Sequence, residues 1–538
     1  MTTRYRILVT DDIDREGVDL LASEPGLEVD SVPTLPSAEL IERIGNYDAL
    51  IGRSATKISE DLLRHAARLR VVGRAGVGID NIALGTATEL GVAIINAPAG
   101  NTIAVAELLF GGLISLLRHL PAADSSMHAG RWDRSRLLGR ELRGRTIGIV
   151  GLGRIGGEVA KRARAFGMTV VGFDPYVSDD RFNTFKARRV QSLDELVSIA
   201  DILTVHTPLN DETTGMIGRR ELARLPAGAV VANLARGGIV EEPALIEALQ
   251  SGSIHGAVID VYTAEPLAPE HPLRSMSNVM LTPHIGASTA EAQRNVAVDV
   301  CVAVRDALLA GELSRSLNVA SVNGLRWEEV QPALLVARRA GAIARALLTD
   351  RGVRALSRLT LRCGSALAGG SGAILAAAAM GAFEGVLDVD RLNLINARAI
   401  AESHGLELMV AESSQLDNPN ALEVGLGGGV QGIAVSGVAA PGSPARITRI
   451  GDFHMDITPR SSLIVLTNHD VPGVIGRVGT VLGAAGVNIA EYHQARLLQG
   501  GEALAAISLD ENVDEALRRQ LLELPDVLSA TVVRFRDP

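Results

Sequence analysis

Short apolar runs alternate with amphipathic stretches over the first hundred residues. The runs have the length and the Val, Ile and Leu content of buried strands, and they cover residues 6–10, 27–32, 48–51, 71–73 and 92–95. The stretches between them predict helices over 16–23, after Ser37, and from Ser59 to Leu69, with both serines as N-caps. Alternating strands and helices are typical of an α/β unit with a parallel sheet.

A second α/β unit follows a long apolar helix predicted at 104–117. Its first strand, 146–150, leads into a glycine-rich turn and a helix with apolar positions every four residues. A capping box from Ser192 to Glu195 opens a later helix. The remaining strands are predicted at 169–173, 202–205, 229–233, 257–259 and 279–281. A long helix over 290–309 is expected to return the chain to the first unit, which makes that unit discontinuous.

The pattern changes after Asn318. Residues 321–457 read as a helix followed by Ala/Gly-rich and β-rich sequence, and the chain from Ser461 onward has the order βαββαβ of a ferredoxin-like domain. The predicted fold is therefore α/β, with two doubly wound Rossmann-like domains, an α+β intervening domain and a small C-terminal domain. The expected boundaries are 1–101 with 290–320, 102–289, 321–460 and 461–538.

Composition narrows the class of protein. The 538 residues carry a net charge of −10 without a long basic run, which argues against nucleic acid or an anionic membrane as partner. The N-terminus lacks the apolar core of a signal peptide, so a cytoplasmic location is expected. Residues 363–383 are uncharged, but their Ala and Gly content favours a soluble segment over a membrane span. Cys301 and Cys363 fall in separate elements and indicate small buried side chains, with no disulfide and no metal site.

The glycine-rich turn has a specific spacing. Gly151, Gly153 and Gly156 form G-x-G-x-x-G between a strand and a helix, and Asp174 ends the next strand. The first glycine permits the turn, the second lets a pyrophosphate approach the backbone, and the third lets helix and strand pack closely. Asp174 can accept hydrogen bonds from a ribose diol and repels a 2′-phosphate. The pattern predicts NAD rather than NADP as cofactor, against the alternative of an ordinary glycine-rich turn.

Polar groups also follow four later strands of this unit. They stand at 206–208, 235–238, 260 and 283–286, and the carboxyl ends of parallel strands share one edge of a sheet. Hydride transfer from a hydroxy acid needs a cation for the carboxylate, a base for the hydroxyl proton and an acid that supports the base. Arg236, His284 and Glu265 fit these three roles, although each alone is equally typical of a surface residue.

At these residues the chain resembles the D-2-hydroxyacid dehydrogenase family. The matching runs are 71–82, 95–102, 151–156, 173–176, 205–209, 233–240, 258–266 and 282–289. The resemblance implies Arg236, Glu265 and His284 as the catalytic residues, and Asp260 as a residue facing the nicotinamide amide. The NAD site that it implies is lined by Val77, Gly151, Gly153, Arg154, Ile155, Gly156, Asp174, Thr207, Ala235, Asp260, His284 and Gly286.

The substrate is predicted from a different set of residues. Arg53 and Arg74 each end a strand of the first unit, and two guanidinium groups suit a phosphate dianion. The resemblance adds Gly78 and Asn101 beside the substrate carboxylate. It implies the branch that oxidises 3-phospho-D-glycerate to 3-phosphohydroxypyruvate, the entry to L-serine synthesis, as a homotetramer.

Two other functions stay open at this point. One is a dehydrogenase for another 2-hydroxy acid, such as glycerate or 2-hydroxyglutarate, and the other is a non-catalytic NAD-sensing scaffold. Arg134 and Arg136 are candidates for a contribution from a neighbouring subunit, or for solvated surface cations.

Residues 466–496 resemble an ACT domain, a small-molecule sensor built across a dimer interface. Asp470 can pair with an amino group and Asn488 with a carboxylate or amide, and the implied effector is L-serine. Asn468 stands where serine-sensing relatives often carry His or Tyr, which leaves serine specificity open against an ACT fold kept for assembly. In the intervening domain, Arg446 and Arg449 are candidates for an anionic effector or one solvated face of a strand.

Overall fold

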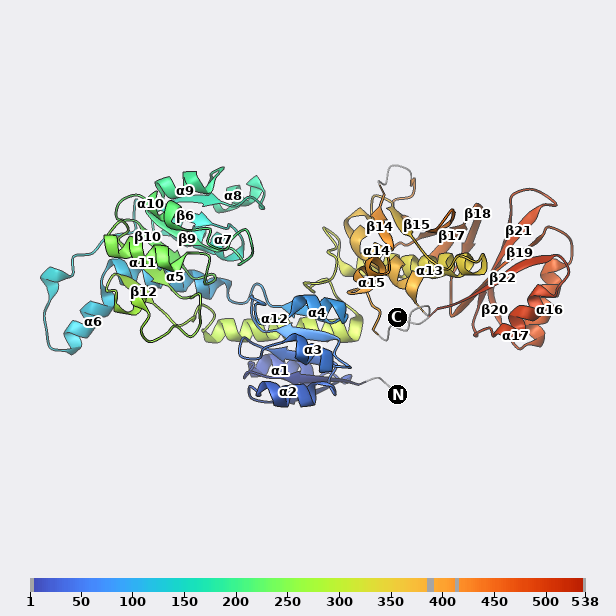
Figure 1. Ribbon diagram of the computed structural model, residues 1–538, viewed down its shortest axis with the longest axis horizontal. Helices are drawn as coiled ribbons and strands as arrows, with labels where there is room; N and C mark the ends of the chain where they lie inside the picture. The colour runs from blue at the N-terminus through green and yellow to red at the C-terminus, as the bar shows by residue number, and fades with distance from the viewer. Residues whose placement is uncertain (1–3, 385–390, 412–415, 536–538) are drawn as a thin grey trace.

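The computed structural model describes residues 4–384, 391–411 and 416–535. Its domains follow one another along an elongated molecule (Figure 1). Two α/β lobes occupy one half, and the intervening and C-terminal domains occupy the other. The α/β sheets and the C-terminal βαββαβ domain confirm the predicted fold class.

The first lobe is a five-stranded parallel sheet in the order β2-β1-β3-β4-β5. Strands and helices alternate along this lobe, and the strands are apolar because both faces of a parallel sheet are covered. Its elements are β1 (Tyr5–Val9), α1 (Arg15–Ala22), β2 (Leu27–Ser31), α2 (Ser37–Ile44), β3 (Ala49–Gly52), α3 (Glu60–His65), β4 (Val71–Arg74), α4 (Leu84–Glu89) and β5 (Ala93–Asn96). The long helix α12 (Ala290–Ala310) packs in this lobe's core through Val296, Val300 and Val304, so the lobe is discontinuous.

The second lobe is a seven-stranded parallel sheet in the order β12-β11-β10-β9-β6-β7-β8. The apolar helix α5 (Thr102–Leu117) enters from the first lobe and packs in the core of the second. The other elements are α6 (Leu120–His128), β6 (Thr146–Val150), α7 (Arg154–Ala165), β7 (Thr169–Phe173), α8 (Asp179–Phe185), β8 (Arg188–Arg189), α9 (Leu193–Ile199), β9 (Ile202–Val205), α10 (Arg219–Ala223), β10 (Val230–Asn233), α11 (Glu242–Ser251), β11 (Gly256–Ile259) and β12 (Val279–Leu281).

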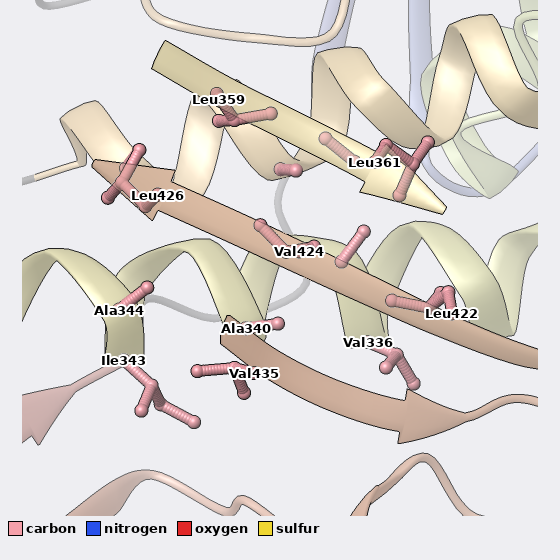
Figure 2. Close-up of a cluster of buried hydrophobic side chains, with 14 of the residues drawn as sticks. Val336, Ala340, Ile343, Ala344, Leu359, Leu361, Leu422, Val424, Leu426 and Val435 are labelled. Carbon is pink, nitrogen blue, oxygen red and sulfur yellow. The ribbon is translucent and has the colours of Figure 1, made fainter. Parts of the chain in front are cut away.

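The intervening domain packs two helices against a mixed six-stranded sheet. Figure 2 shows Val336, Ala340, Ile343 and Ala344 of α13 among side chains of β13, β15 and β16 in one apolar core. The elements are α13 (Trp327–Asp350), β13 (Arg358–Cys363), α14 (Ser371–Phe383), α15 (Ala397–Ser403), β14 (Glu407–Val410), β15 (Ala421–Gly428), β16 (Gln431–Val438), β17 (Arg446–Ile450) and β18 (Phe453–Ile457). The uncharged segment 363–383 thus contains the last residue of β13, a short 3-10 turn and the helix α14, which is buried in this core.

The intervening domain also contacts the first lobe directly. Ile395 is buried in the apolar cluster of that lobe, and the Asn393 side-chain amide donates to the Gly91 carbonyl at 2.7 Å. The Arg391 guanidinium donates to the Ala66 carbonyl. The two domains are therefore fastened directly to each other, besides the chain that joins them.

The C-terminal domain has the predicted βαββαβ order. Its antiparallel sheet runs β20-β21-β19-β22, with one face covered by two helices and the other packed on the intervening domain. The elements are β19 (Ser462–His469), α16 (Val474–Ala484), β20 (Ile489–Arg496), β21 (Glu502–Leu509), α17 (Glu515–Leu522) and β22 (Val527–Arg534).

Two predicted caps are wrong in detail. Ser37 is the first residue of α2, and Pro36 occupies the cap position. No side-chain hydrogen bond forms there, because proline has no side-chain acceptor. The Ser192 hydroxyl accepts from the Glu195 N–H, but the Glu195 carboxylate accepts from the Gln191 N–H rather than that of Ser192, so only half of the capping box forms. Ser59 caps α3 as predicted.

Both cysteines are buried and unbonded, and burial raises the pKa of each thiol to about 12. Among the described residues no single helix is long and apolar enough to cross a membrane. The helices α5 and α6 reach that length and apolar character only when taken together, and they are bent by 64° relative to each other.

Candidate active site

The carboxyl ends of both parallel sheets face one cavity of about 1070 Å³ between the two lobes. The first lobe contributes Arg53, Arg74, Val77 and Gly78, and the second contributes Arg236, Asp260 and His284. The structure therefore brings together residues that the sequence separates by more than two hundred positions. Asn101, Arg154, Ile155, Thr207, Ala235, Glu265 and Gly286 line the same cavity.

The glycine-rich turn between β6 and α7 leaves room for a cofactor. Gly151 has a φ of +89°, and a Cβ there would lie 2.7 Å from the His206 carbonyl oxygen. A Cβ on Gly156 would lie 2.1 Å from the Gly151 oxygen, so only glycine lets the helix pack on the turn. A Cβ on Gly153 would meet nothing within 4 Å, which leaves open space at the helix N-terminus. The turn fits the pyrophosphate of a dinucleotide.

Asp174 stands at the end of β7 beside this turn. Its two carboxylate oxygens accept from the Leu152 N–H at 2.8 Å and from the Tyr176 N–H at 2.9 Å. These bonds fix the carboxylate next to the glycine-rich turn and leave lone pairs for ribose hydroxyls. The arrangement fits NAD, and the negative charge disfavours a 2′-phosphate.

Asp260 anchors the turn that carries His284. Its carboxylate accepts from the Thr282 hydroxyl at 2.5 Å and from the Ile285 and Gly286 N–H groups, both at 2.9 Å. Burial raises the pKa of Asp260, and these donors partly offset that shift. The predicted contact of Asp260 with the nicotinamide amide stays a prediction, because the contacts seen all go to the 282–286 turn.

His284 and Glu265 form a hydrogen-bonded pair at the cavity wall. The His284 Nδ1 lies 2.8 Å from Glu265 Oε2, and Glu265 Oε1 accepts from the Tyr262 N–H at 3.0 Å. His284 has a φ of +54°, a conformation that the bonds to Asp260 hold in place. Because the carboxylate occupies Nδ1, the Nε2 atom of His284 is the nitrogen left for proton transfer.

Arg236 bridges the two lobes. Its Nε donates to Asp80 Oδ2 at 3.0 Å, and its Nη1 donates to the Ala235 carbonyl at 2.6 Å. A Cβ on Gly78 would lie 1.8 Å from Arg236 Nη2, so glycine gives the guanidinium its space. Asp80 is not among the residues predicted from the sequence. It lies in the loop after β4, the strand that ends at Arg74, and this place is the one sequence signal that could have indicated it. The Nη2 donors remain for a substrate.

Arg74 is a half-buried cation among other cations. Burial, together with the nearby charges of Arg236 and Arg53, lowers the pKa of Arg74 to about 10. Its Nε is buried and has no hydrogen-bond partner in the described part of the chain. The same holds for Asn101 Oδ1 and the Thr207 hydroxyl. Buried polar atoms without partners are costly, so this cavity wall suits a polar, anionic ligand.

His206, at the end of β9, is a neutral member of the wall. Burial lowers the pKa of His206 to about 4, and its Nε2 lies 3.0 Å from the Thr204 hydroxyl. The side chain therefore adds no positive charge to the cavity at neutral pH.

The predicted effector residues lie in the C-terminal domain, each with contacts of its own. Asp470 accepts from Arg496 at 2.9 Å and from the Gly500 N–H at 3.1 Å, and the Arg496 bond lowers the pKa of Asp470. The Asn488 side-chain amide donates to Asp510 at 2.7 Å. Asn468 is fully buried, and its amide donates to the His469 carbonyl at 2.6 Å.

The remaining cationic candidates are placed as follows. Arg446 contacts Asp456, Thr458 and Glu491, so its charge is already compensated. Arg449 donates to the Gly451 carbonyl at 2.6 Å and lines a second cavity of about 400 Å³ between the intervening and C-terminal domains. Arg134 and Arg136 lie in an exposed 3-10 turn after α6.

Comparison with known proteins agrees with this geometry. Residues 110–286 match the family described as "D-isomer specific 2-hydroxyacid dehydrogenase, NAD binding domain", and residues 461–526 match the ACT domain. A solved structure titled as NAD+-bound 3-phosphoglycerate dehydrogenase of Entamoeba histolytica is 26% identical, with a TM-score of 0.50, over 59% of this chain and 99% of that one. The fold and the site define an NAD-dependent dehydrogenase of the 2-hydroxyacid class.

Similarity over the whole length narrows the class. A D-3-phosphoglycerate dehydrogenase of Synechocystis is 36% identical over 99% of this chain and 95% of that protein. One of Bacillus subtilis is 35% identical over 98% of this chain and 99% of its own length. The chain belongs to the D-3-phosphoglycerate dehydrogenase family.

Proposed function

We propose that this enzyme oxidises 3-phospho-D-glycerate to 3-phosphohydroxypyruvate with NAD, in the cytoplasm, as the first step of L-serine biosynthesis. The observation that carries the proposal is the gathering of three guanidinium groups, on Arg53, Arg74 and Arg236, in the cavity that holds the His284–Glu265 pair. A substrate with a phosphate dianion and a carboxylate offers anionic oxygens to these guanidinium groups. The names of the full-length relatives support the same substrate.

Each residue has a step in the proposed mechanism. Arg236 binds the substrate carboxylate and polarises the C2 oxygen through the donors that Asp80 and Ala235 leave unused. His284 takes the hydroxyl proton at Nε2. Bound NAD supplies the acceptor for the hydride that leaves C2. Glu265 stabilises the imidazolium through its bond to Nδ1. Closure of the lobes would then exclude water from the exposed His284 ring.

Two other functions compete with this proposal. A dehydrogenase for glycerate or 2-hydroxyglutarate would use the same His284, Glu265 and Arg236. Glycerate would give no use to the cation of Arg74, and the distal carboxylate of 2-hydroxyglutarate would bring it one negative charge where a phosphate brings two. A non-catalytic NAD-sensing scaffold would give no use to the hydrogen-bonded His284–Glu265 pair. The phosphorylated substrate accounts for both features.

L-serine is the proposed effector, bound at the ACT domain between two copies of the chain in a homotetramer. Asp470 would bind its ammonium, and Asn488 of a neighbouring copy its carboxylate. Asn468 is buried, so its proposed part is to support the loop that carries Asp470 rather than to touch the ligand.

The experiment that tests the proposed substrate replaces Arg74. We expect Arg74→Ala to lower kcat/KM for 3-phospho-D-glycerate by about 30- to 100-fold, the loss of a charge-assisted contact. The same variant should change kcat/KM for D-glycerate by less than about threefold, because that substrate lacks the phosphate. Arg64→Ala, an exposed arginine that pairs with Glu89 in the same lobe, is the matched control. Equal losses for both substrates would contradict the proposal.

A further inference from the structure

Beyond β1, the first lobe contains a buried carboxylate that the proposed mechanism does not use. Asp11 is 6% exposed and accepts four hydrogen bonds. Its Oδ1 accepts from the Thr34 and Thr56 hydroxyls at 2.8 and 2.7 Å, and its Oδ2 accepts from the Arg53 and Thr56 N–H groups at 2.7 and 2.9 Å. Within the described ranges Asp11 forms no salt bridge at 4 Å or less, so neutral donors alone hold its charge.

The same loop is held from its other side. The Asn81 amide donates to the Arg53 carbonyl at 3.0 Å and to the Thr56 carbonyl at 2.7 Å. Asp11 takes the N–H groups of these two residues, and Asn81 takes their carbonyls. The backbone of the Arg53 loop is therefore fixed by both its donors and its acceptors, while the Arg53 side chain lines the cavity.

The local geometry is specific to this arrangement. Asp11 has a φ of +66° and Asp12 one of +49°, both in the left-handed region that Asp tolerates better than most residues. A Cβ on Gly52 would lie 2.9 Å from the Thr10 hydroxyl, so the strand before Arg53 packs closely on the segment that carries Asp11. The turn after β1 thus aims one buried carboxylate at one short stretch of backbone.

Burying an unpaired carboxylate is unfavourable unless its hydrogen bonds are complete. Asp11 meets that condition, and it stands beside the cationic wall formed by Arg53 and Arg74. A negative charge there offsets the mutual repulsion of these arginines. Neutral groups would be enough to hold a loop that serves only the fold. The Arg53 loop carries a cation into the cavity, and a carboxylate beside it stabilises that charge.

We propose that Asp11 is a positioning residue for phosphate selectivity, which fixes the Arg53 backbone so that the guanidinium meets the substrate phosphate. The inference rests on the proposed function, since it assigns Arg53 to the phosphate end of that substrate. Asp11 touches no reacting atom and acts through Arg53.

The test is a double-mutant cycle on the full chain, with Asp11→Asn, Arg53→Ala and the double variant. Each is assayed with 3-phospho-D-glycerate and with D-glycerate. Asp11→Asn keeps the shape, but it removes the charge and replaces one of the two acceptor oxygens by an NH2 group. We expect its kcat/KM for the phosphorylated substrate to fall about 10- to 30-fold, mainly through KM, with less than a threefold change for D-glycerate. The double variant should be no worse than Arg53→Ala within about twofold, as coupled residues require.

Asp48→Asn is the matched control, because Asp48 is also a buried carboxylate of this lobe and accepts from the Arg6 N–H at the opposite end of the sheet. It should leave the ratio of the two kcat/KM values unchanged. If Asp11→Asn does not fold, Thr34→Val removes one donor to Asp11 and should lower the same ratio about threefold.

The outcomes separate the two hypotheses. A wild-type enzyme without preference for the phosphorylated substrate would reject the proposed function itself. A wild-type preference that Arg53→Ala abolishes but Asp11→Asn leaves intact would overturn the positioning role alone. Additive losses in the double variant, or an Arg53→Ala variant with unchanged preference, would also overturn it.

Discussion

The cavity between the lobes and the predicted effector residues Asp470 and Asn488 of the ACT domain differ in whether their polar groups already have partners. In the cavity, Arg74 Nε, Asn101 Oδ1 and the Thr207 hydroxyl are buried and have no partner in the part of the chain that the structure describes. In the ACT domain, Asp470 is bonded to Arg496 and Asn488 is bonded to Asp510, whereas the buried Asn468 Oδ1 has no partner among the described residues.

The difference lies in whether a ligand meets unpaired polar atoms or has to break an existing hydrogen bond. In the cavity, a ligand satisfies atoms that otherwise remain costly, so the wall is preorganised for binding. At Asp470, a ligand ammonium must replace an existing charge-assisted bond, and its net gain is smaller. The cavity of a single chain thus has free polar groups for a ligand, whereas the proposed effector binding at Asp470 would need a rearrangement or a second copy.

The largest expected effect comes from removing the proton acceptor of the cavity. His284→Ala should lower kcat by about 10²- to 10⁴-fold, the usual contribution of a positioned general base. NADH affinity, measured by fluorescence titration, should stay within about threefold, because the glycine-rich turn is untouched. His128→Ala, on the exposed helix α6, is the control. A His284→Ala enzyme with wild-type kcat would reject the assignment.

The next effect concerns the cofactor. Asp174→Ala should weaken NADH binding by about tenfold and narrow the preference for NADH over NADPH, since the carboxylate both accepts from the ribose and repels a 2′-phosphate. Asp201→Asn is the comparison, because Asp201 accepts from the Thr146 N–H at the far end of β6. A preference for NADH that survives Asp174→Ala would assign cofactor selectivity to other residues.

A smaller effect is expected at the ACT domain. Arg496→Ala removes the ion pair of Asp470, so the serine concentration for half-inhibition should fall by about two- to fivefold, the energy of one exposed pair. Arg519→Ala, on the exposed face of α17, should leave it unchanged. Lower serine sensitivity in Arg496→Ala would mean that Arg496 itself holds the effector.

The smallest effect is a pH dependence of stability. His206 takes up a proton near pH 6.5 when unfolded but only near pH 4 when folded, so its stabilising contribution is complete above pH 6.5 and falls as the pH drops toward 4. The slope is at most about 1.4 kcal/mol per pH unit. Calorimetry between pH 7 and 5, on the transition that NADH raises, should show a flatter slope for His206→Gln. An unchanged slope would show that His206 titrates normally.

Much of the site follows from the sequence because parallel strands deliver their carboxyl ends to one edge. That rule places Arg53, Arg74, Arg236 and His284 at such edges, and all of them line the cavity, while their roles are predicted from the chemistry of the reaction and the family resemblance. The contact between Arg236 and Asp80 could not be found in this way, because it depends on how far the two lobes close over each other.

Other features depend on packing that no local pattern encodes. Asn468 is buried because the face of β19 that carries it is covered, and the local sequence does not show which face that is. Ile395 reaches the core of the first lobe from a domain that begins after α12. Asp11 follows an ordinary apolar strand, and its left-handed turn leaves no periodic signal in the sequence.

The most direct test of the account is NADH formation by the purified chain with 3-phospho-D-glycerate, D-glycerate and 2-hydroxyglutarate, each with and without L-serine. We predict a strong preference for the phosphorylated substrate, and inhibition by serine only at concentrations that can displace Arg496 from Asp470. Equal rates with the three substrates would contradict the reading of the cationic cavity as a phosphate site.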